Sequence, residues 1–410
     1  MQLPDLLIQG RRLKLSSRQA AINSFEQCFE EAIASNNKPN QVAALTELAL
    51  EFIETKQIPA LERATQVLEQ AAELNSGLNI SSLTAHLNYA LGINALEKYQ
   101  LEESFSLLQS AYSLYESSSK LDNNLAGLSL VDDALGKYYG AISQYPQAMS
   151  HFERSLTRRQ SIKSPANIDP QHLSGISYYH QGQMFLQLYN FEKAQAAFEK
   201  SLDLSLEADY IYLRFQSLVG MVQVEIALAD WDVAEALIEE SLQLAELPLD
   251  LDKLAILYQS RAEALLGNRQ VLEAQDCLQL ETLPRLENLQ NPAGQAIAKR
   301  TMGRILQARL QEGLDRLTTE TIENAEDYFV DASMIFEERG MATEYAKTLY
   351  DVANLYNLCE EFKYNRYQYQ GKAVRSLKLA LSALAKVQGD ISYLSKLIED
   401  SLDRVIGNLS

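Results

Sequence analysis

Apolar residues recur at three- and four-residue spacing along almost the whole chain, and short polar turns separate the runs. The pattern is clear in the stretch that contains Leu186, Tyr189, Ala194, Ala197, Phe198, Ser201 and Leu202. This spacing places apolar side chains on one face of an α-helix. No run of alternating β-branched residues bounded by turn signals interrupts the pattern. The chain is therefore predicted to be all-α.

A small–large–small signature repeats on these predicted helices at a period of about 40 residues. In its clearest copy, Ala194 is followed by Phe198 and Ser201. In the copy that begins at Ala274, Glu281 stands where the last small residue is expected. The copies begin at Ala64, Ser104, Ala148, Ala194, Ala234, Ala274, Ala325 and Ala373. Self-similarity at such a period is typical of helix pairs that stack into a solenoid.

Three copies carry a glycine twelve residues before the first small residue, namely Gly92, Gly136 and Gly182. A glycine at a helix crossing permits close approach, and the large residue of the next helix fills the hole. Near the start, Ala21, Phe25 and Cys28 carry the signature of a second helix whose first helix is missing or degenerate. We predict a solenoid of about eight helix pairs over residues 1–385, and a C-terminal capping helix over 386–410.

The signature resembles the tetratricopeptide repeat (TPR), a helix–turn–helix unit that stacks into a right-handed superhelix. The residues that fit best are Tyr178, Gly182, Phe185, Phe191, Ala194, Phe198 and Ser201. Gln181 departs from the usual leucine, and the spacing here exceeds the common repeat of about 34 residues. The resemblance covers roughly residues 18–385 and implies a right-handed superhelical solenoid. Its long units are similar to the bacterial regulatory and scaffold branch of the family.

In the family, the first helix of each unit lines the concave face through residues that flank the crossing position. The resemblance therefore implies a set of partner-binding candidates: Tyr179 and Gln183 around Gly182, Arg300 and Arg304 around Gly303, and Lys347, Tyr350 and Asn354 around Ala353. Tyr179 and Gln183 stand where the family's carboxylate clamp for chaperone tails has lysine and asparagine. Binding of chaperone tails is therefore not supported.

The cluster of Arg300, Arg304 and Lys347 is unusual in an acidic chain. We expect its guanidinium groups to hold a carboxylate, in an acidic or C-terminal segment of a partner protein or peptide, while Asn354 holds the peptide backbone. The alternative is that the two arginines pair with Glu312, Glu338 or Glu344 on neighbouring helices and solvate the surface.

Composition narrows the partners and the compartment. There are 36 Lys and Arg against 55 Asp and Glu, a net charge of −19, which argues against nucleic acid and anionic membranes as partners. The chain has no run of 18 apolar residues, so no membrane span is predicted. Its first residues lack the basic and apolar regions of a secretory signal. The three cysteines form no CxxC motif. These features favour the cytoplasm.

Two basic segments leave alternatives open. Bases and tyrosines alternate over 363–372 and continue to Arg375, a pattern that can stack on single-stranded nucleic acid, although a solvated loop is the favoured interpretation. The early run of Arg11, Arg12, Lys14 and Arg18 is interpreted as a helix-start surface rather than a docking arm.

No pattern of catalytic residues is present. The chain has no P-loop, HExxH or GxSxG motif, and its four histidines are too far apart to form a metal set. We expect no catalytic residue, metal or cofactor. The predicted function is a non-enzymatic scaffold or adaptor that binds a protein or peptide in its concave groove. The alternative is a peptide-responsive regulator that controls an effector by tightening of the superhelix.

Overall fold

The computed structural model describes residues 4–117, 122–162, 170–244, 251–289, 292–361, 364 and 366–407. These residues form helices and turns without a strand, apart from one isolated bridge between Gln144 and Gln388. The helices are α1 (Asp5–Leu13), α2 (Arg18–Ala34), α3 (Lys38–Glu54), α4 (Ile58–Asn75), α5 (Ser81–Glu97), α6 (Leu101–Ser117), α7 (Asp122–Ala141), α8 (Tyr145–Gln160), α9 (Pro170–Gln187), α10 (Phe191–Glu207), α11 (Ile211–Leu228), α12 (Trp231–Leu244), α13 (Leu251–Gly267), α14 (Val271–Asp276), the π-helix η1 (Cys277–Thr282), α15 (Leu283–Leu289), α16 (Pro292–Gln311), α17 (Thr319–Glu338), α18 (Ala342–Glu361), α19 (Arg366–Leu384) and α20 (Ser392–Gly407). The all-α prediction is confirmed.

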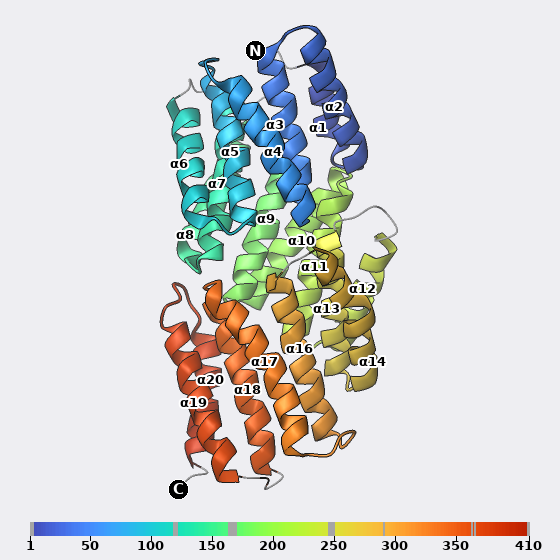
Figure 1. Ribbon diagram of the computed structural model, residues 1–410, viewed down its shortest axis with the longest axis vertical. Coiled ribbons are helices and arrows are strands. Elements are labelled where there is room, and N and C mark those ends of the chain that lie inside the picture. Colours follow the sequence, from blue (N-terminus) through green and yellow to red (C-terminus); the bar gives the residue numbers. More distant parts are fainter. Residues whose placement is uncertain are drawn as a thin grey trace.

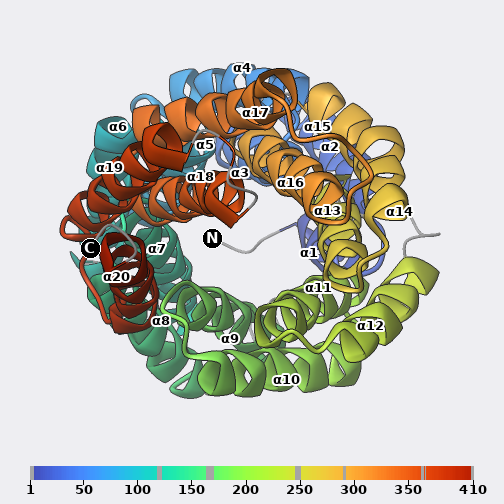
Figure 2. The same ribbon diagram turned by 90° about the horizontal axis from the view of Figure 1, so that it is seen from below.

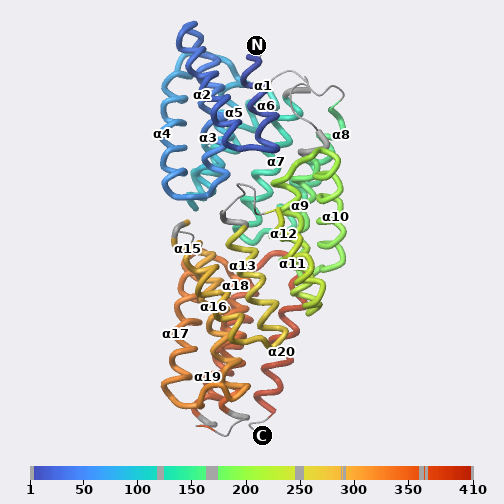
Figure 3. The backbone as a smooth tube through the Cα atoms, turned by 90° about the vertical axis from the view of Figure 1, so that its right-hand side faces the viewer, coloured from blue at the N-terminus to red at the C-terminus, as the bar shows by residue number. Residues whose placement is uncertain are grey.

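Consecutive helices pack in pairs, and the pairs wind around a common axis as a right-handed superhelix (Figures 1 and 2). The first helix of each pair faces the axis, and the second forms the outer wall. The inner helices are α1, α3, α5, α7, α9, α11, α13, α16 and α18. Figure 3 shows two stacked turns, with α1 to α12 in the first and α13 to α20 in the second. The helix α20 packs on α19 at the end of the stack.

The crossing positions predicted from sequence are confirmed by close packing. A Cβ built on Gly182 would lie 2.7 Å from Cε1 of Phe198, and one on Gly303 would lie 2.7 Å from Cε1 of Phe329. Both rings are fully buried. Only glycine permits this approach between the two helices of a pair. From the sequence, the first helix of the first unit was predicted to be missing or degenerate. It is present as the short helix α1, and Gly10 of α1 faces Phe25.

The copy of the signature that begins at Ala274 contains a π-helical turn. Ala274 and Leu278 are fully buried as predicted, but the next buried residue is Thr282, and Glu281 points away from the core. The hydroxyl of Thr282 donates to the carbonyl of Cys277 five residues earlier, at 3.5 Å. A π-turn accommodates one extra residue in a helix. The small position is therefore occupied by Thr282, and the predicted irregularity at Glu281 is an insertion rather than a substitution.

The turns from inner to outer helices share a left-handed residue, which ends the inner helix. Tyr99, Ser143 and Tyr189 have φ of 58° in these turns. After Tyr189, the side chain of Asn190 accepts a hydrogen bond from the backbone N–H of Lys193 at 3.2 Å and caps α10. These compact turns lie along the edge of the first turn of the superhelix that faces the second.

Candidate functional site

The structure brings five of the seven candidate residues together. Arg300 and Arg304 lie on α16, and Lys347, Tyr350 and Asn354 lie on the adjacent inner helix α18. Both helices face the axis of the second turn (Figure 2). The register between them is fixed by hydrogen bonds from Arg300 to α18.

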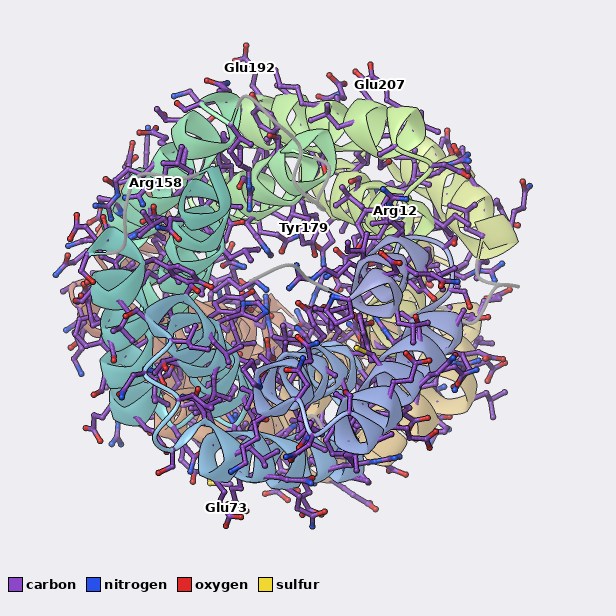
Figure 4. The ribbon with its side chains drawn as sticks, turned by 90° about the horizontal axis from the view of Figure 1, so that it is seen from above. Arg12, Glu73, Arg158, Tyr179, Glu192 and Glu207 are labelled. Atoms are coloured by element: carbon purple, nitrogen blue, oxygen red, sulfur yellow. The ribbon has the colours of Figure 1, made fainter. Side chains whose placement is uncertain are left out.

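The other two candidates lie on α9, in the first turn. Tyr179 is on the inner side of this helix (Figure 4), but it is only 6% exposed, and its ring packs 5.9 Å from that of Phe198. The side-chain amide of Gln183 donates to Gln223 on α11 at 3.4 Å. These two residues are therefore separate from the group on α16 and α18.

Arg300 is held by two carboxylates of α18. Its Nε donates to Oδ2 of Asp351 at 2.6 Å, and its Nη1 lies 3.2 Å from Oε2 of Glu344. The side chain of Arg300 is 17% exposed. Burial alone would lower the pKa of Arg300, but the two carboxylates raise it above its usual range. Of the pairings considered from the sequence, that of Arg300 with Glu344 is formed.

Lys347 shares the same carboxylate. Its Nζ donates to Oε1 of Glu344 at 2.8 Å. Burial would raise the pKa of Glu344, but Lys347 and Arg300 hold it below the usual range. Burial would likewise lower the pKa of Lys347, and Glu344 reverses that effect. With Asp351, these side chains form a set of two cations and two anions, so their formal charges cancel.

Arg304 differs from Arg300 because no described residue forms an ion pair, hydrogen bond or ring contact with it. The side chain of Asn354 likewise has no polar partner among the described residues. The inner helices α16 and α18 run in the same direction, and Arg304 and Asn354 each lie about one helical turn beyond the contact of Arg300 with Asp351. Both are half-buried. A guanidinium and an amide thus remain available on the inner face.

The inner face of the first turn contains a charged group that the sequence did not single out. Glu47 and Glu51 on α3 are 2% and 4% exposed. The Nε of Arg11 donates to Glu47 at 2.7 Å, and Nε2 of His86 lies 3.0 Å from the same oxygen. Arg18 Nε lies 3.7 Å from Oε2 of Glu51. The early basic run is therefore partly engaged inside the molecule.

A second polar group lies between α7, α8 and α9. Arg159 is 1% exposed and donates to Asp133 and to Ser177, and the hydroxyl of Ser177 donates to Asp133 at 2.7 Å. A buried arginine with such partners fixes the register of the packed helices. It offers no surface to a ligand.

The basic segment near residue 370 is described only in part. Lys363 lies outside the described residues, while Lys372 Nζ lies 3.2 Å from Oε2 of Glu326 and over the rings of Tyr356 and Tyr369. These contacts are those of a packed surface. Outer helices elsewhere carry acidic residues that project away from the axis, such as Glu73, Glu192 and Glu207 (Figure 4).

Among the described residues, no group of three or more His, Cys, Asp or Glu is placed to hold a metal ion. One described helix, α11, is long and apolar enough to cross a membrane by length and composition, and 56% of it is buried inside the fold. The apolar pattern of the sequence did not predict this helix as a membrane span. Its apolar character is that of an inner helix packed between its neighbours.

Comparison of the sequence with protein-family models and with curated proteins gives no match. Among solved structures, the chain is similar to a Rap protein complexed with competence and sporulation factor, at 10% identity and a TM-score of 0.57. That match covers 90% of this chain and 98% of the Rap protein. The apo form of RapI (14% identity, TM-score 0.40, 80% and 92% coverage) and yeast Tom70 (12%, 0.37, 97% and 95%) are more distant in shape.

The chain is a TPR-like helical repeat protein. The resemblance seen in the sequence is therefore confirmed at the level of the fold, and an identity of 10% extends it no further. The TPR-like architecture explains why α16 and α18 present their crossing-flanking residues to a common inner face.

Proposed function

We propose that this TPR-like chain is a binding scaffold that holds a peptide or an extended protein segment on the inner face formed by α16 and α18. The proposal is supported by one observation: the side chains of Arg304 on α16 and Asn354 on the adjacent α18 are half-buried and have no polar partner among the described residues. Groups of this kind are stabilised when a ligand completes their hydrogen bonds.

The chemistry of the site favours a carboxylate. A guanidinium binds a carboxylate through two parallel hydrogen bonds, and a neighbouring amide pairs with a peptide N–H or C=O. The charges of Arg300 and Lys347 are already neutralised by Glu344 and Asp351. These paired side chains therefore form a rigid support for the site rather than the principal contact with the ligand. Arg304 is then the residue that recognises the acidic group, and Asn354 the residue that orients the backbone.

Likeness of fold supports the class of function. The Rap protein was solved as a complex with competence and sporulation factor, which shows that a superhelix of similar fold and length holds a ligand in that case. Tyr350 lies on α18 four residues before Asn354, and we propose that its partly buried ring contacts the bound chain. Tyr179 and Gln183 on α9 stay a prediction for a more distant part of the same ligand.

A panel of synthetic peptides tests the proposal. Short peptides with a free C-terminal carboxylate and one internal Glu are compared with amide-capped and Lys-substituted versions by thermal shift and calorimetry. We expect only the acidic peptides to raise Tm, because ligand that binds the folded chain stabilises it by mass action. Arg304→Glu should weaken binding about tenfold or more.

The matched control is Arg375→Glu, which makes the same charge change at an exposed position on the outer helix α19. It should leave binding unchanged. Equal binding of acidic and basic peptides, or equal losses from the two variants, would contradict a specific site at Arg304.

A regulator that responds to a peptide is the second candidate function. The observation that favours it is the contact between the two turns of the superhelix, which gives the molecule a closed state that a ligand can shift.

A further inference from the structure

The two turns of the superhelix meet along a line of contacts that we call the seam. On the first turn it consists of the turn residues Ser143, Gln144, Tyr145, Gln147, Leu188, Tyr189 and Phe191. On the second turn it consists of Thr343, Lys347, Gln388, Gly389 and Tyr393. The seam joins turn residues to turn residues and helix ends, whereas helices within a turn pack along their length.

In the described part of the chain, two backbone hydrogen bonds cross the seam, and both involve Gln388. The N–H of Tyr145 donates to the carbonyl of Gln388 at 3.3 Å, and the N–H of Gln388 donates to the carbonyl of Ser143 at 3.2 Å. Beside them, the hydroxyls of Tyr145 and Thr343 are 3.3 Å apart. Gly389 has φ of 137° and lies so close to Leu188 that a Cβ would be 2.8 Å from its methyl carbon.

Aromatic rings supply the apolar part of the seam. Tyr189 stacks on Tyr393 of α20 with ring centroids 5.1 Å apart, and Phe191 meets the same ring at 6.1 Å. Tyr393 is nevertheless 55% exposed. Among the residues that the structure describes, Tyr189 is the one from the first turn that packs against the buried core of α16 to α20. Across the seam the apolar cores of the two turns therefore have little contact, whereas they are continuous where α11 and α12 pack on α13.

The seam is also incompletely filled. A cavity of about 160 Å³, half-open to solvent, lies within it, lined by residues of both turns that include Tyr99, Met184, Met341 and Glu344. Cavities of this size forfeit van der Waals contacts that close packing would supply. Few hydrogen bonds, a half-exposed ring and a half-open cavity make the seam a weaker interface than the packing between consecutive helices.

Lys347 and Glu344 link the seam to the proposed binding face. The ammonium of Lys347 lies 5.3 Å from the ring centroid of Tyr189, while it donates to Glu344, the partner of Arg300. Glu344 itself lines the cavity of the seam. A charge brought to the inner face beside Arg300 thus acts on Glu344 and Lys347, and through them on the ring contact that spans the two turns.

We propose that the seam is a latch that opens and closes between the two turns, with α20 as its movable half, and that Lys347 couples the charge state of the inner face to it. Its regulatory role rests on the proposed function, while the latch itself does not. When the latch is closed, an extended ligand reaches α16 and α18 only along the axis. When it is open, the inner face is also accessible between the turns.

Hydrogen exchange measures the latch directly in the unliganded protein, through the amides of Tyr145 and Gln388. Tyr393→Ser removes a half-exposed ring, and we expect these two amides to exchange about tenfold faster while the helices keep their protection. The matched control is Leu397→Ser, one turn further along α20 and 38% exposed. It should leave both amides unchanged.

A second pair of variants tests the coupling. Lys347→Gln removes the cation over Tyr189 and should speed exchange of the same amides severalfold, whereas Arg304→Gln, on the same face but outside the seam, should not. If the amides of Tyr145 and Gln388 exchange as slowly in Tyr393→Ser as in the unchanged protein, the latch is overturned. Loss of protection throughout the helices of this variant would overturn it too. Slow exchange in Lys347→Gln alone would overturn the coupling. Failure of acidic peptides to bind at Arg304 would instead overturn the proposed function.

Discussion

Glu47 and Glu51 show how strongly position decides the chemistry of one residue type. They lie one helical turn apart on α3 and are both buried. Burial raises the pKa of Glu51 to about 7, because Lys14 and Arg18 compensate only in part. Burial would also raise the pKa of Glu47, but Arg11 and His86 outweigh it and hold the pKa well below the usual range.

The pH dependence of stability should therefore differ between the two sites. Between pH 4.5 and about 7, the folded chain keeps a proton on Glu51 that the unfolded chain releases, so stability falls as pH rises through this window. Glu51→Gln removes the penalty. We expect a gain in the free energy of unfolding of up to about 3 kcal/mol at pH 8, and a flatter profile from pH 5 to 7. Urea unfolding across this range measures both.

Glu47→Gln is the companion variant, with the opposite sign. Because the pKa of Glu47 is lower in the folded chain than in the unfolded chain, its ionised form stabilises the fold at any pH above the unfolded-state pKa. That stability is lost as the pH falls through the pKa of the folded chain. The variant leaves Arg11 without its carboxylate, and we expect a loss of about 3 kcal/mol or more at pH 7. Parallel pH profiles for the two variants would contradict these assignments.

At this scale, the sequence identified residues whose role follows from spacing on one helix. Gly182 and Phe198 were placed correctly because a crossing requires a small residue opposite a large one. Glu47 was missed because its partner Arg11 is 36 residues away, and their contact depends on how α1 packs on α3. Spacing along a helix carries no information about such a contact.

Among the elements, the π-turn in η1 explains an apparent break in the repeat. Leu280 is 69% exposed and lies inside the π-turn, two residues after Leu278. Deleting Leu280 would bring Thr282 to the spacing of the regular signature and restore an α-helix. We expect the deletion to change the free energy of unfolding by less than about 1 kcal/mol. Chemical denaturation with circular dichroism provides the measurement.

The matched control deletes Lys200, which lies two residues after Phe198 in the regular helix α10. There a deletion shifts Ser201 and the following residues off the core face, and we expect a loss of more than about 3 kcal/mol. A similar cost for both deletions would show that the π-turn is required for packing rather than an accommodated insertion.

The candidate site was predicted in part at this scale. Helical spacing placed Arg300 and Arg304 on one helix and Lys347 and Asn354 on another, and the structure has both as inner helices, while the role of these residues in binding stays a prediction. It gave no sign that Asp351 would bind Arg300, because that contact depends on the rotation of α18 about its own axis. In the proposed site Arg304, rather than Arg300, is therefore the cation without a partner among the described residues.

For the whole molecule, the sequence predicts that the helix pairs stack, but it does not predict the pitch of the superhelix. Each unit rotates slightly relative to the last, and small differences accumulate over the units of one superhelical turn. The contact of Tyr145 with Thr343 joins residues 198 positions apart and has no counterpart in the repeat signature. Turn residues such as Gln388 contribute to the seam through their backbone. Such contacts are invisible to side-chain patterns.

A cross-link tests the closed arrangement of the two turns. Gln144 and Gln388 are bridge partners, and backbones paired in this way lie within the range of Cα separations that a disulfide spans. We expect Gln144→Cys with Gln388→Cys to oxidise readily and to raise the free energy of unfolding by up to about 5 kcal/mol, because the bond closes a loop of more than 200 residues. Non-reducing electrophoresis and denaturation measure both effects.

The control pair is Gln144→Cys with Gln311→Cys, since Gln311 ends α16 outside the seam. It should stay reduced under the same conditions. The native cysteines, Cys28, Cys277 and Cys359, are unpaired in the structure and provide the background. The rate of cross-linking also reports how often the turns separate, so adding Tyr393→Ser should slow it. Equal rates with and without that change would mean that the stacked turns are held by the superhelix itself and owe little to the ring of α20.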